Sequence, residues 1–128
     1  MAHAVTTSPH LRLVRSAQSG SKAMTAVYTV VYTESSVMAY MFASAVIDLS
    51  TMAAGDIIDI RIRKILVSGG AWVPHGALNY IGAMPAGHQT VFISPIPDTY
   101  GVEISMRQTL GVLKSCDVEI YDAKRLGS

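Results

Sequence analysis

Residues 56–64 read DIIDIRIRK, and the pattern of this segment decides the fold class. Isoleucine occupies every second position at its centre, and charged residues of both signs stand between the isoleucines: Ile58, Asp59, Ile60, Arg61, Ile62 and Arg63. Because side chains alternate between the two faces of a β-strand, this spacing predicts a strand with one apolar and one charged face. We expect the isoleucines to pack in a core. We expect Asp59, Arg61 and Arg63 to form an outward, mixed-charge surface that sets the register with a neighbouring subunit through complementary pairs.

Segments typical of strands recur along the rest of the chain. They are rich in β-branched and aromatic residues, and turn signals separate them at spacings of roughly 8–12 residues. No amphipathic pattern supports a helix longer than about two turns. We therefore predict an all-β protein, an antiparallel β-sandwich or jelly roll of about seven or eight strands. The other predicted strands are residues 25–33, 37–47, 89–94, 102–109 and 114–123.

The first 21 residues differ in composition from the rest, being mostly small and polar. Within them the segment LRLVR has leucines at alternate positions: Leu11, Arg12, Leu13, Val14 and Arg15. Two interpretations of this segment stay open, a disordered tail or an arm that pairs as an additional strand with a neighbouring subunit. We predict an extended N-terminal arm over residues 1–21 and a single β-sandwich domain over residues 22–128. No apolar segment typical of a secretory signal is visible in the arm.

The chain is poor in charge. Half of its 128 residues are apolar, 15% are charged and the net charge is +1, whereas soluble domains usually carry about 25% charged residues. We expect part of such a surface to be covered by other subunits. The longest uncharged apolar run, residues 37–47, is shorter than the roughly 20 residues of a membrane helix, and the near-neutral charge is untypical of nucleic-acid-binding proteins. We predict a homo-oligomer, with a trimer favoured, that binds neither a membrane nor nucleic acid directly.

Residues with catalytic or metal-binding potential are scattered along the sequence. The four histidines lack the spacing of a zinc pair, and the serines lack the motif of a hydrolase nucleophile. The single cysteine, Cys116, alternates with Val118 and Ile120 against Asp117 and Glu119, so we interpret it as a small core residue. We expect no enzyme activity, no cofactor and no metal ion.

Trp72 and Tyr80 are candidates for binding a ring-shaped ligand. Trp72 lies in the segment GAWVPHG (residues 70–76), and together with Tyr80 it would form a stacking platform for a sugar if both rings were exposed on one face. The alternative interpretation is that Trp72 anchors a long loop on the sheet, because a lone tryptophan after a turn is commonly a packing residue.

From residue 52 to residue 122 the sequence resembles small all-β structural proteins of phages and prokaryotic viruses. The segments that carry the resemblance are turn and strand signatures: AAGDIIDIRIRK (53–64), IPDTYGVEISMRQTLG (96–111) and KSCDVEIYDAKR (114–125). The resemblance implies a virion component on the capsid surface, a head decoration (cement) protein whose partner is the major capsid protein. It transfers no binding residue to this chain.

We therefore predict a non-enzymatic structural protein of a virion that bridges and stabilises capsid subunits. Two alternatives stay open: the subunit of an extracellular filament assembled by strand exchange, and a carbohydrate- or receptor-binding β-sandwich module. A head protein would form closed rings and a filament open head-to-tail contacts, whereas a binding module would expose Trp72 and Tyr80 together.

Overall fold

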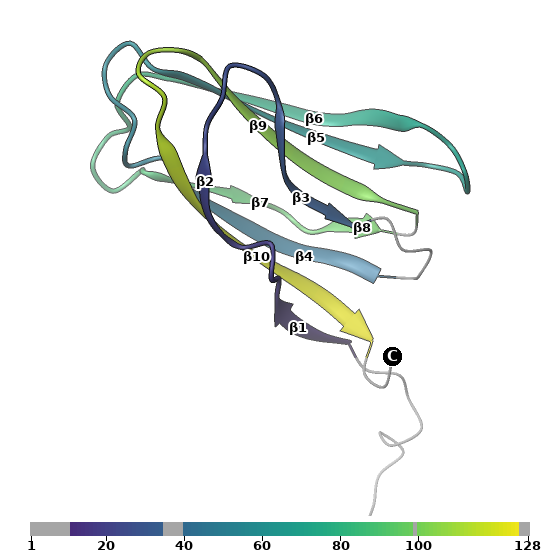
Figure 1. Ribbon diagram of the computed structural model, residues 1–128. Coiled ribbons are helices and arrows are strands. Elements are labelled where there is room, and N and C mark those ends of the chain that lie inside the picture. Colours follow the sequence, from purple (N-terminus) through teal and green to yellow (C-terminus); the bar gives the residue numbers. More distant parts are fainter. Residues whose placement is uncertain (1–10, 35–39, 99, 126–128) are drawn as a thin grey trace, which may run out of the picture.

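The computed structural model describes residues 11–34, 40–98 and 100–125, and these residues form ten β-strands in two facing sheets (Figure 1). Within the same ranges there is no helix of sufficient length and apolar character to cross a membrane. The strands are β1 (Leu11–Arg15), β2 (Gly20–Ala23), β3 (Thr29–Glu34), β4 (Tyr40–Asp48), β5 (Ile57–Ile65), β6 (Trp72–Ile81), β7 (Thr90–Ile93), β8 (Ile96–Asp98), β9 (Val102–Leu110) and β10 (Ser115–Arg125).

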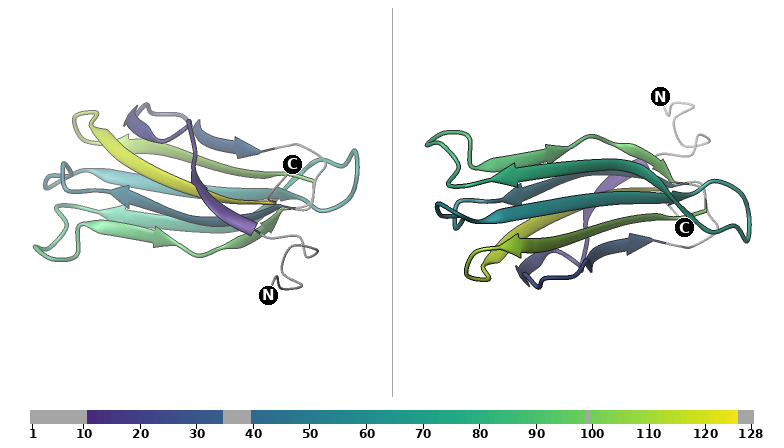
Figure 2. Two further views of the ribbon diagram at one scale, coloured as in Figure 1. Left: turned by 90° about the horizontal axis from the view of Figure 1, so that it is seen from below. Right: turned by 90° about the horizontal axis from the view of Figure 1, so that it is seen from above.

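The ten strands occupy four positions in each sheet (Figure 2). In sheet A, β10 and β4 lie at the centre, β1 and β2 share the position beside β10, and β7 and β8 share the position beside β4. Sheet B has the order β3-β9-β5-β6. All these pairs are antiparallel and nested along the chain: β1 and β2 with β10, β3 with β9, β4 with β7 and β8, and β5 with β6. A long hairpin rolled up in this way is a jelly roll.

The predicted all-β sandwich is confirmed. The expected seven or eight strands agree with the eight positions. The structure has ten strands because each of the two edge positions of sheet A is divided into two short strands. Between β1 and β2 the chain turns, with Ser19 N–H donating to the carbonyl of Ser16, and the Ser19 hydroxyl accepts from Ile120 N–H on β10. Between β7 and β8 lies Pro95, which has no N–H for the ladder. Sheet edges tolerate such interruptions.

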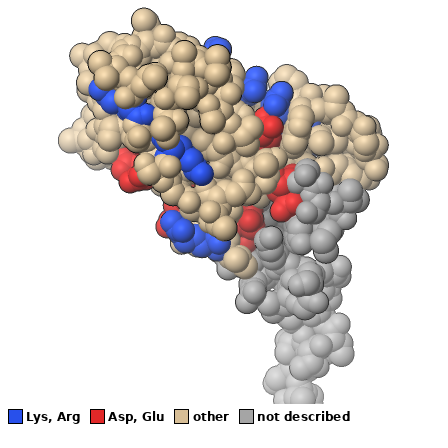
Figure 3. Space-filling model, in the orientation of Figure 1, with Lys and Arg blue, Asp and Glu red and all other residues tan. Residues whose placement is uncertain are grey.

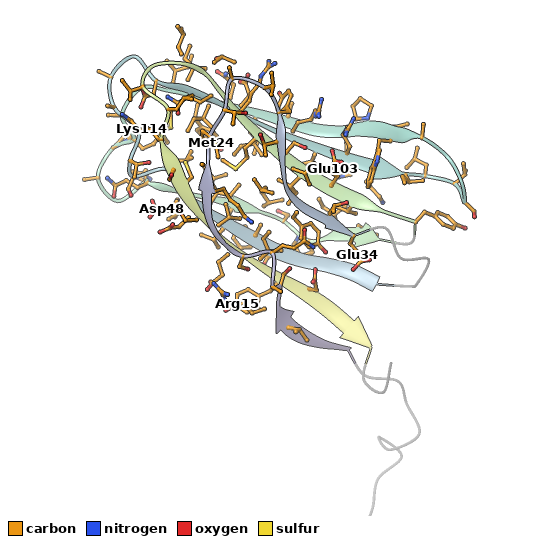
Figure 4. The ribbon with its side chains drawn as sticks, in the orientation of Figure 1. Arg15, Met24, Glu34, Asp48, Glu103 and Lys114 are labelled. Atoms are coloured by element: carbon orange, nitrogen blue, oxygen red, sulfur yellow. The ribbon has the colours of Figure 1, made fainter. Side chains whose placement is uncertain are left out.

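Side chains from the inner faces of the two sheets fill the space between them (Figure 4). Ile58, Ile60 and Ile62 are 0%, 0% and 7% exposed, so the expectation that they pack in the core is confirmed. Full burial of one such side chain contributes about 1.5–3 kcal/mol. The other apolar side chains that are completely buried are Ala45, Ile47, Leu49, Val102, Ile104, Met106, Cys116 and Ile120.

A polar contact between two residues of the described part of the chain joins the two sheets inside the molecule. Tyr32 on β3 donates a hydrogen bond from its hydroxyl to the carboxylate of Asp122 on β10, and both residues are buried. A buried polar group without a partner costs about 1–3 kcal/mol. This hydrogen bond therefore favours one placement of β3 over β10.

Cys116 is completely buried, as the alternation in its strand predicts. Burial raises the pKa of its thiol above the usual 9.0; a hydrogen bond with Thr51 opposes this shift, and the charges of Asp48 and Asp117 add to it. Because the folded state favours the neutral thiol, the resulting stability is fully present below pH 9.0 and is lost as pH rises from there through the raised pKa.

We therefore expect the wild-type protein to lose stability relative to the Cys116→Val variant as the pH is raised from about 8 to about 10. The measurement is the difference between the urea midpoints of the two proteins at each pH. Valine keeps most of the packing volume, so effects of other titrating groups cancel in the difference. An equal difference at both pH values would contradict the raised pKa.

Candidate contact surfaces

The LRLVR segment forms part of the sandwich of its own chain. It is strand β1, and it pairs along its whole length with β10, from Leu11 opposite Arg125 to Arg15 opposite Tyr121. Arg15 is exposed and lies 3.5 Å from a carboxylate oxygen of Glu119. The N-terminal part of the predicted arm, residues 1–10, lies outside the described residues. Pairing of this segment with a neighbouring subunit stays a prediction.

The charges of Asp59 and Arg63 lie on the outer side of sheet B and are compensated within the chain. Arg63 donates two hydrogen bonds to Oε1 of Glu103, the one from Nε at 2.8 Å. Asp59 accepts a 2.9 Å hydrogen bond from Nε of Arg107 and another from the amide of Asn79. These partners stand opposite one another on neighbouring strands. A neighbouring subunit is therefore not needed to pair Asp59 or Arg63.

Arg61 lies between these two ion pairs and, among the residues that the structure describes, has no carboxylate partner. Its guanidinium carbon lies 4.0 Å from the ring centroid of Tyr28, which Arg107 also contacts at 4.4 Å. The Nε atom of Arg61 is buried and has no hydrogen-bond partner in the described part of the chain. Three arginines therefore face two carboxylates on this side of sheet B, and Arg61 carries the excess positive charge.

Trp72 and Tyr80 lie on the same strand, β6, and on opposite sides of sheet B. Tyr80 stands opposite Ile58 and packs against the core. Trp72 lies on the outer side, where its ring centroid is 5.8 Å from the guanidinium carbon of Arg63 and its ring lies close to Gly101. At about 3.3 Å per residue the two positions are about 26 Å apart along the strand. The structure does not bring these rings together as a stacking platform.

A β-bulge in β6 separates the two rings. Ile62 pairs with Gly76 and Arg63 pairs with Pro74, so His75 is an additional residue without a partner on β5. An even spacing along a regular strand puts two side chains on one face. The additional residue reverses the alternation of side chains between the two faces of the strand. Trp72 therefore lies on the outer side of sheet B, at its end.

Asp56 organises one end of the sandwich, where four connections meet. Its buried carboxylate accepts a 2.8 Å hydrogen bond from the N–H of Ala53 and lies 3.7 Å from Nζ of Lys114. Its backbone carbonyl accepts from the N–H of Gly82. Gly111 packs directly against Asp56 with a φ of +87°, and a Cβ atom at this glycine would lie 1.9 Å from Oδ1. The four connections are residues 24–28, 49–56, 82–89 and 111–114.

Gln108 holds the connection between β9 and β10 in one shape. Its side chain is buried, and its Nε2 donates to the carbonyl oxygens of Leu110 at 2.9 Å and Val112 at 2.8 Å. Its Oε1 accepts a 2.9 Å hydrogen bond from the N–H of Lys114. Both donor hydrogens of the amide are thus used inside the protein. Sequence reasoning did not identify Gln108, Asp56 or Gly111 as a group.

A shallow hollow of about 350 Å³ lies on the outer side of sheet A. Its lining carries three carboxylates, Asp48, Asp117 and Glu119, and one cation, Arg15, which gives a net charge of −2. In Figure 4 Asp48 and Arg15 are labelled on sheet A, the lower of the two sheets in that view, with Asp48 further to the left. Within the described ranges no group of three or more His, Cys, Asp or Glu residues is placed to hold a metal ion.

Comparison with known proteins identifies a fold. Neither a family model nor a curated protein sequence matches the chain. Among solved structures, the chain superposes on VP2 of infectious bursal disease virus in its subviral particle, with a TM-score of 0.55 over 91% of this chain. The fold is shared with a viral particle protein. The sequence identity is 14%, and the chain spans 33% of the VP2 chain, so the likeness concerns one part of VP2 and its fold alone.

This likeness supports the all-β sandwich fold that the sequence predicts. It does not concern decoration proteins in particular, and it carries no binding residue to this chain. The candidate contact surfaces are therefore the outer side of each sheet and the end of the sandwich organised by Asp56 and Gln108.

Proposed function

We propose that this protein is a structural component of a virion, and that it acts as a decoration protein on the capsid surface. The observation that carries the proposal is the superposition of 91% of the chain on VP2 of a subviral particle. A fold by itself hosts many functions, so composition is the second support. Only 15% of the residues are charged, which suits a protein whose surface is largely covered in an assembly.

A decoration protein acts mechanically, by adding contact area between neighbouring capsid subunits. Each copy contributes modestly, and many simultaneous contacts around a closed shell multiply the effect. The ion pairs of Arg63 and Asp59 are made within one copy, so the subunit is internally complete before it binds. A rigid subunit loses less entropy on binding than a flexible one. The proposed partners are other copies of this chain, with a trimer favoured, and the major capsid protein.

The two alternative roles have less support. A filament assembled by strand exchange would require β1 to leave β10, with which it forms five register pairs in its own chain. A carbohydrate-binding module would require Trp72 and Tyr80 on one face, whereas a bulge in β6 turns them to opposite sides of the sheet.

The test is the solution mass of the purified chain by light scattering over a dilution series, followed by electron microscopy of the same samples. We expect a discrete closed oligomer, with the mass of a trimer. Hollow shells built by this chain alone would contradict the decoration role and retain the virion structural role. A monomer at every concentration would contradict both, because the charge-poor surface would then be exposed in the working state.

A further inference from the structure

Exposed apolar side chains gather at the end of the sandwich where β9 ends. Val27 is 70% exposed, Ile81 69%, Leu110 57%, Val112 76% and Leu113 54%. We call these five residues the apolar end. Leu110 and Ile81 stand on either side of Ile57 in sheet B, so the group continues from the connections onto the outer side of the sheet.

Backbone hydrogen bonds hold the segments of the apolar end together. The N–H of Met24 donates to the carbonyl of Lys114 at 2.8 Å, and the N–H of Gln108 donates to the carbonyl of Thr25 at 2.8 Å. These bonds fix the connection that carries Val27 beside the connection that carries Val112 and Leu113. With the side-chain hydrogen bonds of Gln108 in addition, the apolar end is a preformed surface, and ordering it on binding costs little entropy.

The apolar end carries no uncompensated charge. The four connections at this end contain one acidic and one basic residue, Asp56 and Lys114, and these lie 3.7 Å apart. In Figure 3 this end, at the upper left, is mostly tan. The hollow on sheet A, in contrast, has a net charge of −2. The two surfaces therefore differ in the partner that each can accept.

In a twofold contact the same surface lies on both sides of the axis, whereas in a trimer only the residues that line the threefold axis meet their own copies. A surface with net charge that lies on such an axis faces its own charge, and such like-charge contacts are strongly unfavourable. The hollow on sheet A is excluded from the axis for this reason, whereas the apolar end is compatible with a position on it. An acidic or basic partner, in turn, would find no charge to recognise at the apolar end.

The size of the apolar end agrees with the centre of a subunit interface. Five side chains that are each more than half exposed present on the order of 400 Å² of apolar surface, comparable to the largest apolar patch of a typical monomer. A stable interface buries about 800 Å² on each partner, with an apolar centre and a polar rim. The patch thus supplies roughly half of the area that one partner buries in a stable interface.

We infer that the apolar end is the surface through which copies of this chain bind one another. The inference rests on the proposed function, in which the working form is a homo-oligomer, and it names the contact that forms that oligomer. Burial of Val112 and Val27 against a second copy removes the two most exposed side chains of this surface from water. The hollow on sheet A and the opposite end of the sandwich remain outside the contact.

The test compares two matched variants, Val112→Glu at the apolar end and Val67→Glu at the opposite end. Both valines lie in connections between strands, and both are largely exposed, at 76% and 64%. We expect the oligomer of the Val112→Glu variant to dissociate at protein concentrations at least about tenfold higher than the wild-type oligomer does. The reason is that a charge at the axis faces its own copy. We expect Val67→Glu to assemble like the wild type. The measurement is mass by light scattering over a dilution series.

The outcomes separate the inference from the function on which it rests. A wild-type oligomer that Val112→Glu leaves intact, or that Val67→Glu dissociates equally, would overturn the inference and leave the proposed function standing. A wild-type monomer at every concentration would overturn the proposed function itself. Leu113→Glu serves as a second variant at the apolar end, and equal melting temperatures of all variants establish that any dissociation is not caused by unfolding.

Discussion

The Gly111→Ala variant is expected to lose about 4 kcal/mol of unfolding free energy. An alanine with φ near +87° has its Cβ too close to the backbone, which costs about 1–2 kcal/mol. The new Cβ would also lie 1.9 Å from Oδ1 of Asp56 and 3.0 Å from its Cα. Asp56 cannot turn away freely, because its carboxylate accepts the Ala53 N–H and lies beside Lys114. Relieving such a collision costs a further 1–3 kcal/mol, typically about 2.

The matched control is Gly69→Ala in the connection between β5 and β6. Gly69 has a φ of +72°, and a Cβ at this position would meet no atom within 4 Å. It therefore isolates the backbone term, and we expect a loss of about 1 kcal/mol. Urea unfolding of both variants and the wild type measures the difference; near the melting temperature 1 kcal/mol corresponds to about 4 °C for a chain of this size. Equal losses in the two variants would show that Asp56 yields to the new methyl group.

The second large effect is expected for Arg63→Met, which should lose about 2–4 kcal/mol of unfolding free energy. The side chain of Glu103 is only 8% exposed, and its Oε1 accepts both hydrogen bonds from Arg63 and a third from the hydroxyl of Ser105. Methionine keeps the aliphatic part of the arginine and removes its charge. Removing one partner of a buried ion pair leaves the other charge desolvated and uncompensated, which costs up to about 3–5 kcal/mol; the partial exposure of Arg63 reduces the loss here.

Arg61→Met is the matched control, with the same substitution on the same face of the same strand. It removes the contact with Tyr28, worth about 0.5–1 kcal/mol, and it also removes a buried Nε for which the described residues provide no hydrogen-bond acceptor. These effects oppose each other, so we expect a change within about 1 kcal/mol. Equal losses for the two variants in thermal or urea unfolding would refute the assignment of Arg63 to Glu103. A change of oligomeric mass without a change of stability would instead support the expectation that these residues contact a neighbour.

The ion pairs of sheet B left a signal in the sequence that a search for single motifs does not detect. Asp59 and Arg63 are four residues apart, and Glu103 and Arg107 are four residues apart with the same order of charges. When two such strands run antiparallel, each carboxylate can stand opposite an arginine. The structure has this arrangement. The four-residue spacing of the charges is compatible with these two ion pairs, but only the register between β5 and β9 brings the partners opposite one another.

Gln108, Asp56 and Gly111 left no comparable signal. Each is an ordinary residue in its local sequence, and the group forms because the jelly roll brings the connection before β5 against the connection after β9. The same holds for the apolar end, whose residues come from two connections and from the ends of β6 and β9. Local sequence indicates that a leucine or valine lies in a loop. It does not indicate which loops meet.

The sequence by itself determined the faces of the strands. Ile58 and Ile60 on β5, and Cys116 and Ile120 on β10, are buried as their alternation predicts, because alternation is a local property of an extended backbone. It also determined the two-sheet class, since strands with one apolar face must bury it against a second layer.

Only the tertiary structure decided where the alternation fails and which surfaces combine. The bulge at His75 turns Trp72 away from the side of Tyr80, although their even spacing predicts one face. The LRLVR segment lies on β10 of its own chain, a pairing that its five residues do not specify. Both outcomes depend on contacts between residues distant in sequence, and the free energy of such contacts is defined only once the sheets have formed.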